Sequence, residues 1–116
     1  MRIFREETFG PVAPLITVAD EEEAIALAND SEYGLSAGII TANEERGLEI
    51  AGRLETGMVH INDSSVSDEA NAPFGGVKNS GTGRHNGKFS IEAFSELRWV
   101  TLDRGGRQYP PPFNEN

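Results

Sequence analysis

The sequence predicts an α/β fold, in which a parallel β-α-β-α-β sheet is followed by a third helix and a last strand. Apolar runs at 12–18, 35–41 and 58–62 alternate with helical patterns at 20–28 and 43–54. The connections between these segments are short, which favours parallel strands joined by right-handed crossovers. A sheet of this kind binds ligands beyond the carboxyl ends of its strands.

The first strand, Val12 to Val18, contains Pro14 and is therefore predicted at an edge or at a strand start. Asp20 is a suitable N-cap for the helix that follows, and Glu23 completes a pattern like a capping box. The acidic run 20–23 has a second interpretation as a cation site. We favour the first turn of a helix, where carboxylates are stabilised by the helix dipole.

The second helix is capped by Asn43 and is expected to end with Gly57 as its C′ residue. Gly47 and Gly52 each cost this helix about 1 kcal/mol relative to alanine. Close packing against the sheet is the expected compensation.

A third helix is expected to start at Ser90, with Phe89 packing as a staple against Phe94. Residues 98–102 favour a β-strand, and the proline-containing tail from Gly105 is expected to be extended.

The 116 residues are enough for one domain, and their composition excludes several functions. A net charge of -9 disfavours nucleic-acid binding. The absence of cysteine excludes a disulfide framework and a thiolate zinc site, and we expect no metal site. We see no export leader and no segment long enough to span a membrane, so a cytoplasmic location is expected.

The glycine-rich loop 75–83 fits neither common phosphate-binding motif. Gly76 and Gly81 have P-loop spacing, but Thr82 occupies the position that requires lysine. A dinucleotide fingerprint starting at Gly81 has its last glycine one residue late, at Gly87. We therefore interpret the loop as one that needs positive φ and tight packing.

Histidine and serine residues offer a weak alternative function, a serine hydrolase. His60 lies within a predicted strand and is interpreted as a core histidine with satisfied hydrogen bonds, while His85 lies in a loop. Short polar residues at 63–69 could complete a hydrolase triad, but no nucleophile-elbow pattern surrounds them. Turn and loop roles are favoured for them.

Two blocks carry a family resemblance over residues 4–113. The first is EETFGPV at 6–12, and the second is PFGGVK at 73–78, followed by SGTGR at 80–84. Together, at this separation, they resemble the C-terminal part of an NAD(P)-dependent aldehyde dehydrogenase. The resemblance implies the catalytic-domain fold of that family for residues 1–97, and an oligomerisation strand and tail for residues 98–116.

The resemblance also implies roles for three residues. Glu7 matches the glutamate that binds the hydroxyls of the nicotinamide ribose, and Phe9 matches the phenylalanine beside the nicotinamide. Phe74 matches a phenylalanine of the aldehyde pocket, whose mouth is shaped by a loop corresponding to 64–71. Many family members have a glutamate where this chain has His85, so that glutamate's polar network is not carried over.

Segments 91–94, 97–101 and 107–110 resemble the branch that acts on benzaldehyde, salicylaldehyde and vanillin, in aromatic compound degradation. The resemblance does not indicate which aldehyde is used, or whether NAD or NADP is the cofactor.

The family's nucleophile is a cysteine, and this chain has none. The sequence is therefore interpreted as a truncated piece of an aldehyde-oxidising enzyme, inactive alone and binding no cofactor by itself. The alternative is a non-catalytic, self-associating assembly module or a truncated relic. In both cases a homo-oligomer formed through strand 98–102 is expected.

Overall fold

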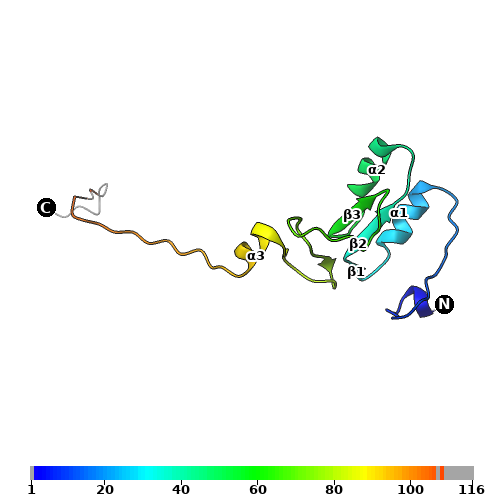
Figure 1. The fold of residues 1–116 in the computed structure, drawn as a ribbon, viewed down its shortest axis with the longest axis horizontal. Helices are drawn as coiled ribbons and strands as arrows, with labels where there is room; N and C mark the ends of the chain where they lie inside the picture. The colour runs from blue at the N-terminus through cyan, green and yellow to red at the C-terminus, as the bar shows by residue number, and fades with distance from the viewer. Residues whose placement is uncertain (1, 107, 109–116) are drawn as a thin grey trace.

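The computed structural model describes residues 2–106 and 108, as a small α/β body with extended segments at both ends (Figure 1). None of the helices in this part of the chain is long and apolar enough to cross a membrane. In chain order the elements are η1 (Arg2–Phe4), α1 (Glu21–Asn29), β1 (Tyr33–Gly34), β2 (Ser36–Ile39), α2 (Glu44–Ala51), β3 (Met58–Ile61), β4 (Val77–Lys78) and α3 (Gly87–Ala93).

The centre of the body is the parallel pair β2 and β3, joined by α2. Their register runs from Ser36 opposite Met58 to Ile39 opposite Ile61. A Cβ on Gly47 of α2 would lie 3.1 Å from the Ile61 Cγ2 atom. The glycine thus lets α2 approach β3 closely, so the expected parallel β-α-β unit is confirmed here, and the expected packing against the sheet is confirmed for Gly47. It is wrong for Gly52, where an added Cβ would lie nearest the Glu49 carbonyl oxygen of the same helix, at 3.5 Å.

Helix α1 begins as its sequence predicts and packs beside α2. The Asp20 carboxylate accepts from the Glu23 N–H at 2.9 Å, and the Glu23 carboxylate accepts from the Ala19 N–H at 2.7 Å. The ion pair Glu21–Arg46 joins the two helices, and Glu22–Arg53 joins α1 to the residue after the C-cap of α2. The acidic run is therefore a capped, ion-paired first turn, and the cation-site interpretation has no support in this geometry.

Two expected strands are not formed. Residues 12–18 and 98–102 have no β-ladder, and their apolar side chains are open to solvent, as at Leu15 (98% exposed) and Trp99 (87%). Figure 1 shows the segment after α3 running away from the body. A strand needs a partner for its backbone groups, and the described residues offer neither segment one. The three-stranded β-α-β-α-β sheet is therefore present only in its β2–α2–β3 part.

Helix boundaries differ from expectation at two places. Helix α2 ends at Ala51, so Gly57 is not its C′ residue. Gly57 instead lets β3 start against the Pro-Phe-Gly-Gly block, because a Cβ there would lie 1.9 Å from the Gly75 carbonyl oxygen. Helix α3 begins at Gly87 rather than Ser90, and Phe94 is its exposed C-cap rather than a staple partner of Phe89.

The glycine-rich segment is held to the body by an antiparallel pair. Strand β4 pairs with β1, with Tyr33 opposite Lys78 and Gly34 opposite Val77. The Lys78 ammonium donates to the carbonyls of Asn29 and Ser31, where α1 ends. This arrangement fixes the block that carries Phe74 beside the start of β3.

Candidate functional site

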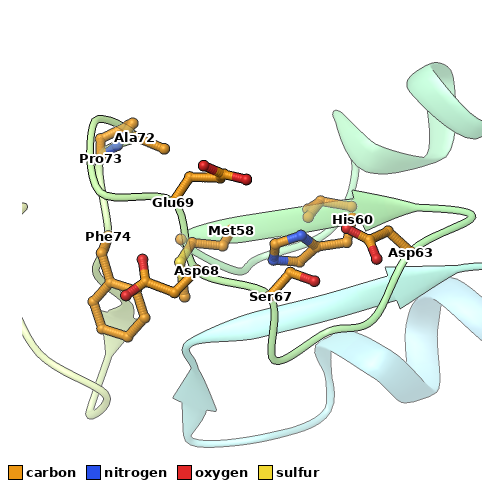
Figure 2. A pocket seen from close by; sticks show the side chains of 11 residues that line it. Met58, His60, Asp63, Ser67, Asp68, Glu69, Ala72, Pro73 and Phe74 are labelled. Atoms are coloured by element: carbon orange, nitrogen blue, oxygen red, sulfur yellow. The ribbon is translucent and has the colours of Figure 1, made fainter. Parts of the chain in front are cut away.

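A cavity of about 460 Å³ lies between β3, the loop at 63–69 and the Pro-Phe-Gly-Gly block. Its walls include Met58 and His60 of β3, carboxylates of the loop, and Phe74 (Figure 2). Sequence reasoning expected Phe74 and the loop at such a site. It did not identify Met58 and His60, although their alternation along β3 places both on one face of the strand.

His60 departs from its expected role as a satisfied core histidine. Its Nε2 atom is buried and has no hydrogen-bond partner. The loop after β3 covers this face of the sheet, because a Cβ on Gly38, the residue opposite His60, would lie 3.6 Å from the Ser65 Cβ. Figure 2 shows the imidazole reaching from β3 toward Ser67 and Asp68. The His60 Nε2 atom is thus available to form a hydrogen bond with a molecule bound in the cavity.

Asp63 supplies negative charge at the rim of this cavity. Its carboxylate accepts from the Ser64 N–H at 2.7 Å. This bond, the Ser67 hydroxyl and the nearby His60 imidazole, in that order, hold the pKa of Asp63 below its usual range. The group is therefore a carboxylate at neutral pH.

The hydrolase alternative is not supported by this geometry. No hydrogen bond described for residues 2–106 and 108 joins His60 or His85 to a serine hydroxyl. A serine nucleophile needs a base within hydrogen-bond reach. Among the same residues, no group of three or more His, Asp or Glu is arranged to hold a metal ion.

Phe74 is half-buried, and its backbone is fixed by an antiparallel bridge to His85. The His85 N–H donates to the Phe74 carbonyl at 2.8 Å, and the Phe74 N–H donates to the His85 carbonyl at 3.2 Å. The His85 ring lies 5.9 Å from the Phe94 ring, centroid to centroid. His85 thus holds the Phe74 wall of the cavity in place through its backbone.

Glu7 and Phe9 are separate from this cavity. Glu7 lines a second hollow, of about 550 Å³, between the N-terminal segment and strands β1 and β2. Phe9 is 92% exposed. The N-terminal segment is tied to α1 by Arg5, which lowers the pKa of Asp30 through a bidentate hydrogen bond. The structure therefore brings Phe74 together with the loop at 63–69, but it does not bring Glu7 and Phe9 to Phe74.

Glu7 and Phe9 are the residues that the family resemblance assigns to one end of a nicotinamide cofactor. No hydrogen bond or ion pair of the described residues engages the Glu7 carboxylate, so it can accept two ribose hydroxyls. The exposed Phe9 ring offers an apolar face for a flat ring. Arg5, the cation nearest in sequence, is occupied by Asp30, so the hollow offers little for a pyrophosphate.

Solved structures share this fold. A salicylaldehyde dehydrogenase from Pseudomonas putida G7, complexed with salicylaldehyde, has a TM-score of 0.88 at 49% identity, covering 95% of this chain and 23% of that chain. An aldehyde dehydrogenase from Mycobacterium tuberculosis, complexed with NAD+, has a TM-score of 0.83 at 42% identity, covering 93% of this chain and 22% of that chain. The fold is thus that of a segment of these enzymes.

Sequence comparison agrees. A vanillin dehydrogenase of Pseudomonas fluorescens is 56% identical over 110 residues, which are 95% of this chain and 23% of the relative. The chain therefore spans about a quarter of the relatives that it matches. Its residues 1–100 match the aldehyde dehydrogenase family. The chain belongs to the aldehyde dehydrogenase family, as its two sequence blocks indicated.

Proposed function

We propose that this chain is the C-terminal part of an NAD(P)-dependent dehydrogenase that oxidises aromatic aldehydes to carboxylic acids. Residues 1–97 would complete its catalytic domain, and residues 98–116 would form its oligomerisation strand and tail. The observation that carries the proposal is the similarity to enzymes named for vanillin and salicylaldehyde over 95% of the chain. The aromatic wall formed by Phe74 in the cavity is consistent with such a substrate.

Each of the three assigned residues has a physical role in this proposal. The Phe74 ring forms an apolar wall against the aromatic ring of the aldehyde. The Glu7 carboxylate accepts the ribose hydroxyls, and Phe9 covers one face of the nicotinamide. The nicotinamide, when bound, supplies the electron acceptor for the oxidation. Glu7 and Phe9 are too small a part of a dinucleotide site to retain NAD or NADP alone, so calorimetry with either is expected to show no micromolar binding.

The same proposal implies that the chain does not turn over by itself, because it has no cysteine to attack the aldehyde. The test is NADH formation, read by absorbance, with benzaldehyde and NAD+. The purified chain is expected to match the enzyme-free blank. Co-expression with the part of the Pseudomonas fluorescens vanillin dehydrogenase that precedes the matched region is expected to restore turnover.

Two results would contradict the proposal. Robust NADH formation by the pure 116-residue chain would refute the inactivity. A co-purified, folded pair of the two parts that oxidised no aromatic aldehyde would refute the function. The control is the vanillin dehydrogenase divided at the same position, which shows whether the division alone abolishes activity.

The unpaired segments also have a place in this proposal. In the complete enzyme, residues 12–18 would add to the parallel sheet as its first strand, giving the β-α-β-α-β arrangement. Residues 98–102 would pair with a second subunit. The exposure of Leu15 and Trp99 supports this, because apolar side chains of this size are normally covered in a stable soluble fold.

A second candidate function is a non-catalytic, self-associating module, and the extended shape favours it. The Cα radius of gyration is 23.1 Å, against about 13 Å for a compact domain near this length. Among the described residues, Ile25 is the one large apolar residue that is buried, at 6% exposure. We expect dimers or larger species through strand 98–102. Light scattering over a wide concentration range tests this, and a constant monomer mass would exclude it.

The variant Trp99→Lys provides the matched comparison, since it places a charge in the unpaired strand without touching the body. It is expected to shift the species toward monomer. An unchanged mass distribution would show that association uses another surface.

A further inference from the structure

Asn86, which is hydrogen-bonded to Asp68 of the cavity lining, has an unusual backbone conformation for a non-glycine residue. Its φ is 73° and its ψ is 147°, a region that is close to exclusive to glycine. Side chains are held in such conformations only where the surroundings determine them strongly. The unusual backbone of Asn86 therefore indicates that its surrounding contacts hold it in place.

The Asn86 side chain joins α3 to the loop on the cavity rim. Its Nδ2 donates to the Asp68 Oδ1 atom at 2.9 Å and to the Glu69 carbonyl at 3.2 Å. Its own backbone N–H donates to the Ser90 Oγ at 2.8 Å, which fixes the residue to the first turns of α3. One amide thus holds both the side chain of Asp68 and the backbone next to it.

The neighbouring residues contact the same region. A Cβ on Gly87 would lie 3.3 Å from the Cα of Asn71, two residues after the loop at 63–69, so the chain passes close to the end of the loop as well. His85 forms the backbone bridge to Phe74. Residues 85–87, which we call the clasp, therefore contact two walls of the cavity. One is the aromatic wall formed by Phe74, and the other is the acidic loop at 63–69.

The acidic loop gives the cavity a charge preference. Asp63, Asp68 and Glu69 line it together with the single imidazole of His60, and no described residue among its walls is Lys or Arg. A carboxylate on an occupant would meet like charge here, whereas a neutral aromatic ring would not. The strength of this repulsion depends on how closely the loop is held to the cavity.

We propose that Asn86 is a positioning residue that holds Asp68 and the acidic loop against the cavity, so that the cavity selects neutral aromatic aldehydes over aldehydes that carry a carboxylate. This inference rests on the proposed function, because it takes the cavity as the aldehyde pocket.

The test is an NMR titration of the 116-residue chain with benzaldehyde and with 4-carboxybenzaldehyde, following the amides of Ser67 and Phe74. In the wild-type chain the carboxylated aldehyde is expected to bind about tenfold more weakly. In Asn86→Gly the ratio of the two dissociation constants is expected to fall toward one. Thermal stability is expected to stay near the wild-type value in this variant, because relief of the unusual backbone offsets the loss of the two side-chain hydrogen bonds.

These two readouts separate positioning from a structural role. A merely structural Asn86 would lower stability on substitution and leave the binding ratio unchanged, and this pattern would overturn the inference. Asn79→Gly is the matched control, because Asn79 also donates its amide to a carboxylate, that of Glu32 at 2.7 Å, but away from the cavity. It is expected to keep the wild-type ratio.

The wild-type titration separates the inference from the function on which it rests. Equal affinity for both aldehydes at Phe74 would overturn the selection while leaving an aldehyde pocket. Absence of any shift at Phe74 with either aldehyde would remove the pocket, and the inference with it. Asn86→Asp, which places a further carboxylate beside Asp68, is expected to displace the loop and to lower the ratio as Asn86→Gly does.

Discussion

Gly57→Ala is the substitution for which the structure makes its sharpest quantitative prediction. Strand β3 starts where its backbone crosses the Pro-Phe-Gly-Gly block. An added Cβ at Gly57 would lie 1.9 Å from the Gly75 carbonyl oxygen and 2.8 Å from the Gly76 Cα. Both neighbours are backbone atoms, so no side chain can rotate away to make room.

The size of the effect follows from this overlap. Non-bonded heavy atoms approach to about 3.5 Å at their energy minimum, so the two backbones must separate by more than about 1 Å. Overpacking of this kind costs about 1–3 kcal/mol, and a backbone clash belongs at the upper end. Because Ile25 is the one buried apolar residue among those described, a loss of about 3 kcal/mol is a large part of the free energy of unfolding.

The assay is urea denaturation followed by circular dichroism, comparing the free energies of unfolding of wild type, Gly57→Ala and Gly52→Ala. Gly52 is the matched control. Its φ is -67°, and the nearest atom to an added Cβ is 3.5 Å away. Alanine there is expected to stabilise by about 0.4–1 kcal/mol, because it restricts the unfolded chain.

Gly57→Ala within about 0.5 kcal/mol of wild type would contradict the account, since surface changes have effects of that size. It would mean that β3 and the Pro-Phe-Gly-Gly block do not approach as described. The fixed position of Phe74 beside the cavity would then lose its support.

Three further predictions concern single side chains. Asp20→Ala removes the N-cap of α1 and is expected to cost about 1 kcal/mol of unfolding free energy in urea, with no loss arguing against the cap. Asn29→Ala removes an amide that donates to the Arg53 carbonyl and accepts from the Glu55 N–H, and a cost of about 1–3 kcal/mol is expected in the same assay; a neutral result would refute this link. The lowered pKa of Asp63 stabilises the fold above its unfolded pKa of about 3.9, and this contribution is lost as the pH falls through the lower folded value. Asp63→Asn is therefore expected to lower the free energy of unfolding at neutral pH and to weaken its decrease toward acidic pH in a circular-dichroism titration. An unchanged decrease at acidic pH would show that Asp63 does not stabilise the fold in this way.

Local signals in the sequence predicted the local structure well. Asp20 and Glu23 form the predicted reciprocal cap, and Asn43 caps α2 by accepting from the Arg46 N–H at 3.0 Å. The β2–α2–β3 unit follows from apolar runs separated by a helical segment. These features depend on residues a few positions apart, so one sequence is sufficient to identify them.

Features that depend on distant partners could not be predicted in this way. Residues 12–18 have the composition of a strand, but strand formation depends on a partner that the described chain does not provide. Gly57 was interpreted as a helix terminator, because nothing in its local sequence indicates the approach of Gly75. Glycine is compatible with a helix end and with a close backbone contact, and only the tertiary structure shows which of the two is present.

The candidate site was predicted in part, for the same reason. Phe74 and the loop after β3 were identified from the family resemblance, and the structure places them around one cavity. The unpartnered His60 Nε2 and the clasp of Asn86 were missed. Both depend on how the loop at 63–69 folds back, which has no periodic signal in the sequence.

The most direct test of the central claim is the steady-state kinetics of a chimera. In it, residues 1–116 replace the matching segment of the Pseudomonas fluorescens vanillin dehydrogenase, which supplies the rest of the enzyme. We predict that Glu7→Gln raises the KM for NAD+ about tenfold and leaves that for benzaldehyde unchanged, because one charged hydrogen-bond acceptor is worth about 1.5–3 kcal/mol. Phe74→Ala is predicted to do the reverse. If both variants kept wild-type values for both ligands in an active chimera, neither residue would have its assigned role, and the account would be contradicted.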